Sequence, residues 1–240
     1  MKNSATYLVI GNGRVAQHFR HYFSLLGLNV STWHRQQPWD ELYQALPLAS
    51  HILLLISDQA IEPFIEQHLK NSRAIRLHVS GSLLSNHACG AHPLMCFSHT
   101  LYRLEQYQAI PFIVDDHAPD FSQLLPGIPN QHVRLPTALK AKYHALCVLS
   151  GNFSCLLWQK LFSSFEEEFH FPASIAYPYL QQQMQNLLTD AKTALTGPLV
   201  RDDIQTLNKN LAALATDPFA EVYKSFVACY QQLHKEKMIS

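Results

Sequence analysis

The chain has 240 residues, which is long enough for one large domain or two modest ones with a substantial core. Eighteen Lys and Arg residues balance eighteen Asp and Glu residues, so the overall charge gives no support for binding nucleic acid or anionic lipid. Only 15% of the residues are charged and 48% are hydrophobic, a balance that predicts a surface partly covered by another subunit.

Apolar runs and cysteine spacing both indicate where the protein resides. The longest apolar runs, such as Ile52–Ile56, are far shorter than a membrane span, and the N-terminus has no basic region followed by an apolar signal core. Five cysteines show no disulfide framework, which is typical of a reducing compartment. We therefore expect a cytoplasmic protein that neither enters a membrane nor binds nucleic acid.

Short apolar runs alternate with helical periods in the first third of the chain. Strands are expected at Tyr7–Ile10, Leu28–Thr32, Ile52–Ile56 and Ile75–Val79. Beyond Ser80, short extended pieces at Ile110–Val114 and His132–Leu135 are interpreted as closing strands of the same sheet. The pattern predicts an α/β fold over residues 1–136, a Rossmann-type doubly wound parallel sheet covered by helices.

From Thr137 onward the pattern becomes helical. Helices are expected over Ala138–Phe169, Ser174–Leu195 and Ile204–Leu214, with a terminal helix that follows Asp217-Pro218 and ends near Lys235. The sequence therefore predicts a second, all-helical domain over residues 137–240.

A glycine motif lies between the first expected strand and the first helix. Gly11-Asn12-Gly13-Arg14-Val15-Ala16 matches G-x-G-x-x-A. In this motif the first glycine makes the turn, the second lets a pyrophosphate approach the backbone, and the alanine allows close packing. We interpret these six residues as a dinucleotide-binding loop; the alternative is a tight turn that binds nothing.

The end of the second expected strand bears on which dinucleotide is bound. Enzymes that use NAD place an acidic residue there, where it binds the ribose 2′-hydroxyl. Residues 31–37 contain no carboxylate but include His34 and Arg35. Arg35 can pair with a 2′-phosphate, and Arg14 could reach the same group. NADP is therefore predicted, unless Arg35 is a solvated surface residue.

Two further loops are expected at the carboxyl edge of the sheet, where open α/β folds bind ligands. Ser57 and Asp58 follow the third expected strand, and Ser80 and Gly81 follow the next. We expect all four at the cofactor, with Ser80 near the nicotinamide and within reach of a substrate oxygen. The alternatives are a helix cap for Asp58 and an ordinary turn at Ser80-Gly81.

Cysteines and histidines gather in one short segment, at Cys89, His92, Cys96 and His99. Zinc could use these spacings, but structural zinc sites usually pair ligands across two knuckles. Core thiols and loop histidines are the better interpretation, and no metal is predicted.

Two polar residues of the long expected helix are candidates for catalysis. Delivery of a hydride to a carbonyl or imine needs a proton donor, which a histidine can supply. His144 and Asn152 are eight residues apart, roughly 80° around a helix and two turns along it, so both could border one cleft. A solvated helix face is the alternative.

Taken together, these motifs resemble the 6-phosphogluconate dehydrogenase-like superfamily, in the branch with a Rossmann domain and a helical domain of unknown function. Pyrroline-5-carboxylate and ketopantoate reductases are relatives of that branch, as are deazaflavin-dependent NADP oxidoreductases. The resemblance rests on the glycine motif, His78-Val79-Ser80-Gly81, His92-Pro93-Leu94 with Phe97, Tyr143-His144 with Asn152, and Thr196-Gly197-Pro198-Leu199-Val200-Arg201 with Asp203.

This resemblance implies NADP(H) on the first domain, a cleft between the domains, and homodimers formed through the helical domain. It also implies that His92, Arg201 and Asp203 contact the substrate, although a Gly-Pro break with a capping aspartate explains the last two equally well. Asp202 stands where the branch usually has glycine.

The related hydroxyacid dehydrogenases carry a catalytic lysine with an asparagine one helical turn later. Here Lys142 is followed at that spacing by Leu146, so their mechanism does not transfer. The expected function is an NADP(H)-dependent oxidoreductase that transfers a hydride to or from a small carbonyl or imine, with His144, Asn152 and Ser80 at the reacting group. The alternative is a non-catalytic NADP-binding sensor or assembly protein on the same fold.

Overall fold

The structure is a computed structural model that describes residues 5–239, with side chains described for residues 5–234. The chain forms two compact units that divide after Leu157, and each is described by itself. The sheet ends at Leu135, next to the domain boundary expected at residue 136, whereas the compact units divide later, within the long helix.

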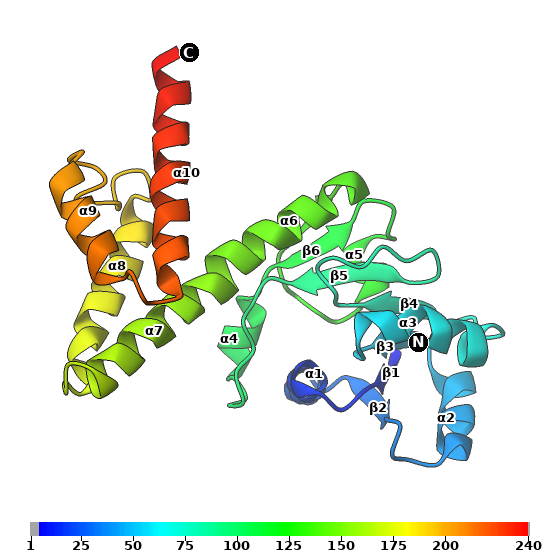
Figure 1. The fold of residues 1–240 in the computed structure, drawn as a ribbon. Coiled ribbons are helices and arrows are strands. Elements are labelled where there is room, and N and C mark those ends of the chain that lie inside the picture. The colour runs from blue at the N-terminus through cyan, green and yellow to red at the C-terminus, as the bar shows by residue number, and fades with distance from the viewer. Residues whose placement is uncertain (1–4, 240) are drawn as a thin grey trace. The chain divides into compact units, whose positions relative to one another are not determined.

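The first unit is built around a seven-stranded sheet in the order β2-β1-β3-β4-β5-β6-β7 (Figure 1). The strands are β1 (Thr6–Ile10), β2 (Asn29–Trp33), β3 (His51–Leu54), β4 (Ile75–His78), β5 (Cys89–Pro93), β6 (Phe112–Asp115) and β7 (His132–Leu135). Neighbouring strands are parallel except β5 and β6, which pair antiparallel. Strand order and direction confirm the expected doubly wound sheet, which departs from the expected parallel pairing only between β5 and β6.

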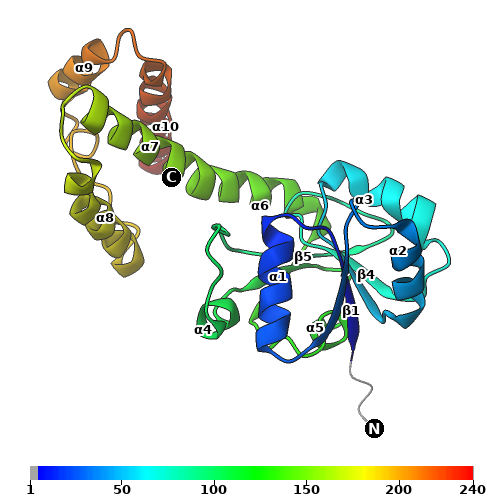
Figure 2. The ribbon, with the colours of Figure 1, turned by 90° about the horizontal axis from the view of Figure 1, so that it is seen from below.

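Helices cover both faces of this sheet, as Figure 2 shows for α1 on one side and α2 and α3 on the other. They are α1 (Arg14–Leu25), α2 (Trp39–Ala45), α3 (Asp58–Phe64), α4 (Leu104–Gln108) and α5 (Phe121–Leu124). Alternate strand residues point to opposite faces. Tyr7 and Val9 therefore belong to the core under α1, while Leu8 and Ile10 belong to the core under α2 and α3.

A long helix follows the sheet. It begins with a 3-10 turn at Thr137–Leu139 and runs through α6 (Lys140–Cys147), a π-helical segment at Val148–Asn152, and α7 (Phe153–Glu167). By length and composition, Thr137–Glu167 is apolar enough to cross a membrane, and no residue of its apolar window is buried. No other helix in the described residues passes this test. The sequence predicts no membrane span, because its longest uninterrupted apolar runs are far shorter than a span.

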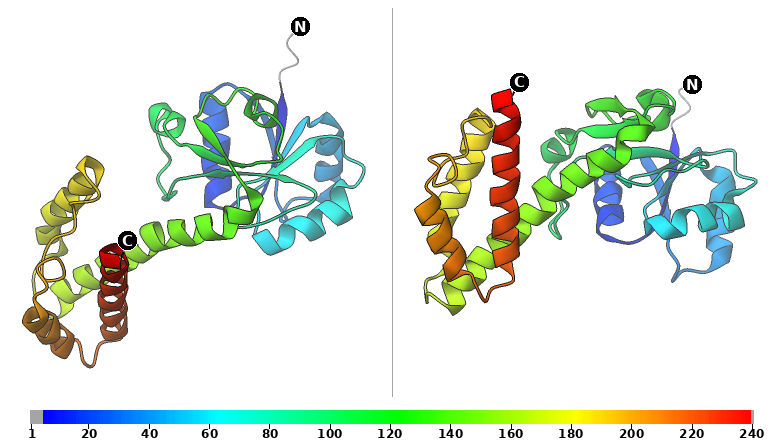
Figure 3. Two further views of the ribbon diagram at one scale, coloured as in Figure 1. Left: turned by 90° about the horizontal axis from the view of Figure 1, so that it is seen from above. Right: turned by 45° about the horizontal axis from the view of Figure 1, so that its top comes forward.

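The second unit is helical, as expected, and contains α8 (Tyr177–Thr189), α9 (Ile204–Ala213) and α10 (Phe219–Ile239), which Figure 3 shows joined by loops. Inside this unit Lys160 Nζ lies 2.5 Å from Asp217 Oδ2, just before α10. The helix expected to continue to Leu195 ends at Thr189 instead. Asp190 is extended there, and its carboxylate accepts hydrogen bonds from Lys192 N–H and Thr193 Oγ1.

Strand β5 was not predicted, because its sequence Cys-Gly-Ala-His-Pro has little strand propensity. Its central position explains why it forms nevertheless. Gly90 and Ala91 are buried between β4 and β6, and pairing with both neighbours satisfies its backbone groups.

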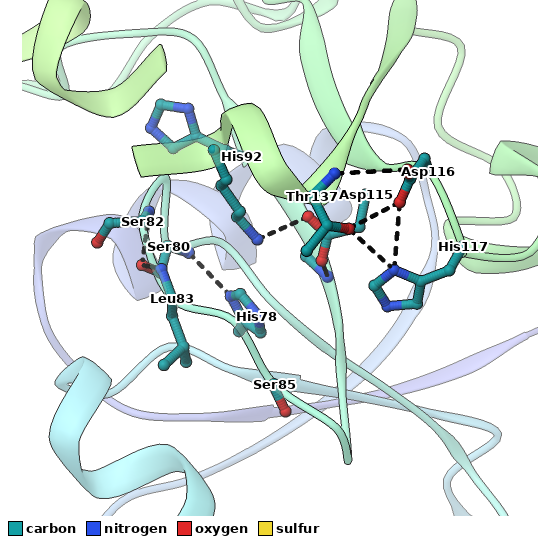
Figure 4. Close-up of polar contacts among 12 residues, drawn as sticks. His78, Ser80, Ser82, Leu83, Ser85, His92, Asp115, Asp116, His117 and Thr137 are labelled. Carbon is teal, nitrogen blue, oxygen red and sulfur yellow. Dashed lines mark hydrogen bonds and ion pairs between the residues drawn. The ribbon is translucent and has the colours of Figure 1, made fainter. Parts of the chain in front are cut away.

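A buried ion pair attaches the long helix to the sheet (Figure 4). Lys140 Nζ lies 2.6 Å from Asp115 Oδ1, and both side chains are at least 95% buried. The other carboxylate oxygen of Asp115 accepts the backbone N–H of Gly90 at 2.7 Å. A Cβ at Gly90 would overlap both charged groups, so glycine is required beside the pair.

Removal of the lysine charge should therefore destabilise the first unit. In Lys140→Met, Asp115 would keep its charge in a buried site, and we expect the free energy of unfolding to fall by about 3–5 kcal/mol in urea denaturation. Lys224→Met is the control, because its pair with Glu221 is exposed and should contribute less than about 1 kcal/mol. Equal effects of the two substitutions would contradict this account.

His78 lies at the end of β4 with no exposed surface. Its Nδ1 accepts the backbone N–H of Ser80 at 3.2 Å, while its Nε2 is buried and has no hydrogen-bond partner among the described residues. Burial, and to a smaller extent the positive charge of Lys140, lowers the pKa of His78 to about 4. His78 is therefore neutral at neutral pH.

This low pKa predicts acid sensitivity. As pH falls below the unfolded-state value of 6.5, the unfolded chain binds a proton that folded His78 does not bind until about pH 4. The free energy of unfolding should thus decrease between pH 6.5 and 4, by about 1–3 kcal/mol from His78 alone. Urea denaturation at pH 7.5 and 4.5 should show a smaller difference in His78→Gln than in the wild type; identical pH dependence would contradict the assignment.

Candidate functional site

A cavity of about 870 Å³ opens at the carboxyl ends of the strands. Chain connections leave β1 and β3 toward opposite faces, so this crevice is the topological switch point where open α/β sheets bind ligands. Its wall is formed by residues 10–15, 33–36 and 54–58, together with Trp39, Ala60, Ile61, Phe64, Val79 and Ser80.

The predicted glycine loop forms one side of the cavity. Gly11 has φ +129°, and a Cβ there would overlap the backbone oxygen of Leu55, so only glycine fits. Gly13 is different: no atom lies within 4 Å of the place where its Cβ would be. The first intrahelical bond of α1 runs from Gln17 N–H to the Gly13 carbonyl, so the amides of residues 14–16 lack an intrahelical acceptor. Free amides beside open space form an anion site.

Most of the predicted cofactor residues are brought together at this cavity. The lining includes Gly11, Asn12, Gly13, Arg14, Val15, His34, Arg35, Ser57, Asp58 and Ser80. Ala16 is fully buried on α1, where it packs against the core, and Gly81 lies beside Ser80 but outside the lining.

At the β2 end, His34 and exposed Arg35 line the cavity, and no carboxylate from residues 33–36 accompanies them. Trp39 and Phe64 form an aromatic wall at this end that the sequence analysis did not identify. Trp39 lines the cavity because of the way α2 packs, and no local sequence motif predicts that packing.

The side chain of Arg14 is engaged elsewhere. Its Nη2 lies 2.8 Å from His99 Nε2, and its Nη1 donates to the Phe97 carbonyl at 3.4 Å. Arg14 thus joins the glycine loop to the segment after β5. A contact between Arg14 and a 2′-phosphate stays a prediction.

At the β4 end, Ser80 is held by hydrogen bonds (Figure 4). Its hydroxyl donates to Asp58 Oδ2 at 2.5 Å and accepts the N–H groups of Ser82 and Leu83. Ser57 is the N-cap position of α3, and neither it nor Asp58 makes a side-chain capping bond. The carboxylate of Asp58 therefore orders the turn after β4 instead of capping α3.

Two histidines meet beside Gly81. A Cβ at Gly81 would lie 2.6 Å from His144 Cδ2 and 3.2 Å from His92 Nε2, so the missing side chain makes room for both imidazoles. The ring centroids of His92 and His144 are 6.4 Å apart. Burial, with smaller contributions from His144 and Lys140, lowers the pKa of His92 to about 4.

Asn152 lies in the π-helical segment of the long helix and is exposed. π-Helical turns are often found at functional sites. In the described part of the chain no hydrogen bond joins Asn152 to His144. A Cβ at the preceding residue, Gly151, would lie 3.7 Å from Cys96 Sγ.

Arg201 and Asp203 belong to the second unit. Asp203 is the N-cap of α9: its carboxylate accepts Thr206 N–H at 3.0 Å and Thr206 Oγ1 at 2.7 Å, and these bonds hold its pKa below the usual range. The capping alternative is thus observed, and substrate contact by Arg201 and Asp203 stays a prediction. Among the side chains of residues 5–234, no three His, Cys, Asp or Glu residues are grouped to hold a metal.

Residues 114–229 match a domain of unknown function, DUF2520. Comparison with curated protein sequences finds no relative. Among solved structures, a Bacteroides fragilis protein provisionally described as an NADP oxidoreductase is similar over 95% of this chain and 98% of its own, with a TM-score of 0.77 and 16% identity. A Thermotoga maritima protein is similar over 97% of this chain and 100% of its own, with a TM-score of 0.68 and 18% identity.

A reductive aminase from Aspergillus terreus, solved with NADPH and ethyl levulinate, is similar over 98% of this chain and 95% of its own, with a TM-score of 0.63 and 15% identity. At such identities these likenesses establish the fold. The resemblance noted from the sequence motifs is thereby confirmed for the fold: the chain has a Rossmann-type domain followed by helices, as these solved structures do.

Proposed function

We propose that this protein is an NADP(H)-dependent oxidoreductase that transfers a hydride to or from a small carbonyl or imine compound. The observation that carries the proposal is the cavity at the switch point, which combines the Gly11–Ala16 loop, free amides at the start of α1, and Arg35 at the end of β2. Its volume lies within the range of small-molecule and cofactor sites.

The cofactor would lie along this cavity. Gly11, Asn12, Gly13 and Val15 would hold the pyrophosphate, while His34 and Arg35 would hold the 2′-phosphate. Ser57, Asp58, Ser80 and Gly81 would border the nicotinamide end. The NADPH complex of the Aspergillus terreus reductive aminase, which has the same fold, supports this choice of cofactor.

When bound, the cofactor would supply or accept the hydride, and the side chains of this chain would handle the proton and the polar groups. His144 is proposed as proton donor or substrate-orienting residue, with Ser80 and Asn152 polarising the reacting group. His92 and Asp203 would contact the substrate, and Arg201 would bind an anionic substituent. The roles of His144, Ser80 and His92 are supported by proximity. Both imidazoles meet at Gly81, the residue after Ser80.

One observation favours a second candidate, a non-catalytic NADP-binding sensor or assembly protein. The Ser80 hydroxyl already donates its proton to Asp58 and therefore has no proton left to donate to a substrate. The absence of a lysine-asparagine pair at Lys142 and Leu146 is consistent with this candidate.

Nucleotide binding is the first test. Isothermal titration should show that the wild type binds NADPH more tightly than NADH. Gly13→Ala should weaken NADPH binding at least about tenfold without lowering the unfolding midpoint, because the added methyl group enters open space that the pyrophosphate needs. Arg35→Gln should weaken NADPH but not NADH, while exposed Arg73→Gln, which lies outside the cavity, should change neither.

If the wild type bound neither nucleotide, the oxidoreductase proposal would be wrong. If NADPH binds, a screen of small ketones and cyclic imines separates the two candidates. In the enzyme, His144→Ala and Asn152→Ala should lower kcat/KM by about 100-fold or more. Tight NADPH binding with no turnover of any compound would favour the sensor.

We also propose a homodimer formed through the long helix. Leu146, Leu149, Phe153 and Leu156 follow at intervals of three or four residues, which places them on one face, and they are 48–55% exposed. An exposed apolar stripe of this kind is typical of a surface covered by a partner. The low charged fraction of the chain agrees with such coverage.

Light scattering of the purified wild type should therefore give twice the chain mass. Leu149→Glu combined with Phe153→Glu should produce monomers, because two carboxylates would be buried at the interface. Gln181→Glu, on exposed α8, should leave the dimer intact. A monomeric wild type that sediments with lipid vesicles would show that the apolar helix contacts a membrane instead.

A further inference from the structure

Tyr143 contacts the imidazole of His92 from the long helix. The phenolic oxygen lies 2.7 Å from His92 Nδ1, and the two rings meet edge to face at 5.7 Å. The other ring nitrogen, Nε2, has no hydrogen-bond partner among the described residues. One side of the imidazole is therefore held by the protein, and the other is free to bind a ligand.

The chemistry of the pair indicates which group donates. Burial raises the pKa of Tyr143, with a further rise from Cys147, so the phenol keeps its proton. His92 is neutral at neutral pH, because burial lowers its pKa to about 4. A neutral imidazole carries one proton, and its bare nitrogen is a much better acceptor than a phenolic oxygen. Tyr143 therefore donates to Nδ1, which leaves the imidazole proton on Nε2.

The free nitrogen lies beside the Ser80-Gly81 turn. Nε2 of His92 lies 3.2 Å from the position that a Cβ would occupy at Gly81, so a larger residue there would crowd the nitrogen. Ser80, the preceding residue, lines the cavity at its β4 end. His144 flanks the same place, with Cδ2 2.6 Å from that Cβ position.

We propose that Tyr143 is a positioning residue that holds His92 in one tautomer, with Nε2–H as a fixed hydrogen-bond donor to an oxygen of the substrate. A neutral donor polarises a carbonyl or binds a carboxylate oxygen. A protonated imine offers no acceptor at its nitrogen, so this arrangement selects carbonyl compounds over iminium ions. The inference rests on the proposed oxidoreductase function and specifies its substrate class.

The tautomer can be measured directly in the full chain without substrate. Long-range 1H–15N correlation spectra of protein with 15N-labelled histidine distinguish protonated from bare ring nitrogens, and His92→Asn identifies the His92 signals. We expect a protonated Nε2 and a bare Nδ1 at pH 7. Tyr143→Phe should convert His92 to a mixture of tautomers.

Cys147→Ala is the matched control on the same helix. It removes the other neighbour of Tyr143 but leaves the phenol in place, so the His92 signals should stay as in the wild type. A wild-type His92 protonated on Nδ1 would overturn the proposal, as would a Tyr143→Phe spectrum identical to that of the wild type.

Substrate class is tested with NADPH-loaded protein, a panel of small 2-oxo acids and ketones, and a panel of cyclic imines. Carbonyl compounds should have the higher kcat/KM, and Tyr143→Phe should reduce the ratio of carbonyl to imine turnover at least about tenfold. A wild type that binds NADPH but prefers imines would refute this inference alone. A wild type that binds no NADPH would refute the proposed function, whatever the tautomer of His92.

Discussion

The buried ion pair between Asp115 and Lys140 determines where the long helix begins against the sheet. Because Lys140 is in the first turn of α6, Tyr143 and His144 follow about one turn later and meet His92 and the Gly81 turn. A buried charge pair forms only in one geometry, since each charge loses hydration that only its partner replaces. The positions of His92 and His144 relative to each other therefore depend on an ion pair to which neither histidine belongs.

The two ends of the candidate site use different physical means. At the glycine loop, backbone amides and the start of α1 create a site for negative charge, with Arg35 beyond it. At the β4 end, burial keeps His78 and His92 neutral, and hydrogen bonds hold Ser80 in place. The glycine-loop end therefore suits a group that carries negative charge, whereas the β4 end presents neutral, oriented side chains.

Composition and structure also agree about the surface of the chain. A low charged fraction predicted apolar surface, and the structure places part of it on the helix Thr137–Glu167. That helix had been interpreted only as a domain element, because its apolar residues recur at helical spacing and resemble a buried face. Whether such a face is buried or exposed depends on what packs against it, which periodicity does not record.

The sequence by itself determined the features that arise from neighbouring residues. Buried strands such as Tyr7–Ile10, the turn at Gly11 and the helices that follow depend on local backbone preferences and periodicity, so they could be predicted. Only the tertiary structure decided that Cys89–Pro93 is a strand, that Asp58 orders Ser80, and that His92 meets Tyr143. These contacts join residues far apart in the chain, and their geometry comes from strand register and helix packing, which no local pattern specifies.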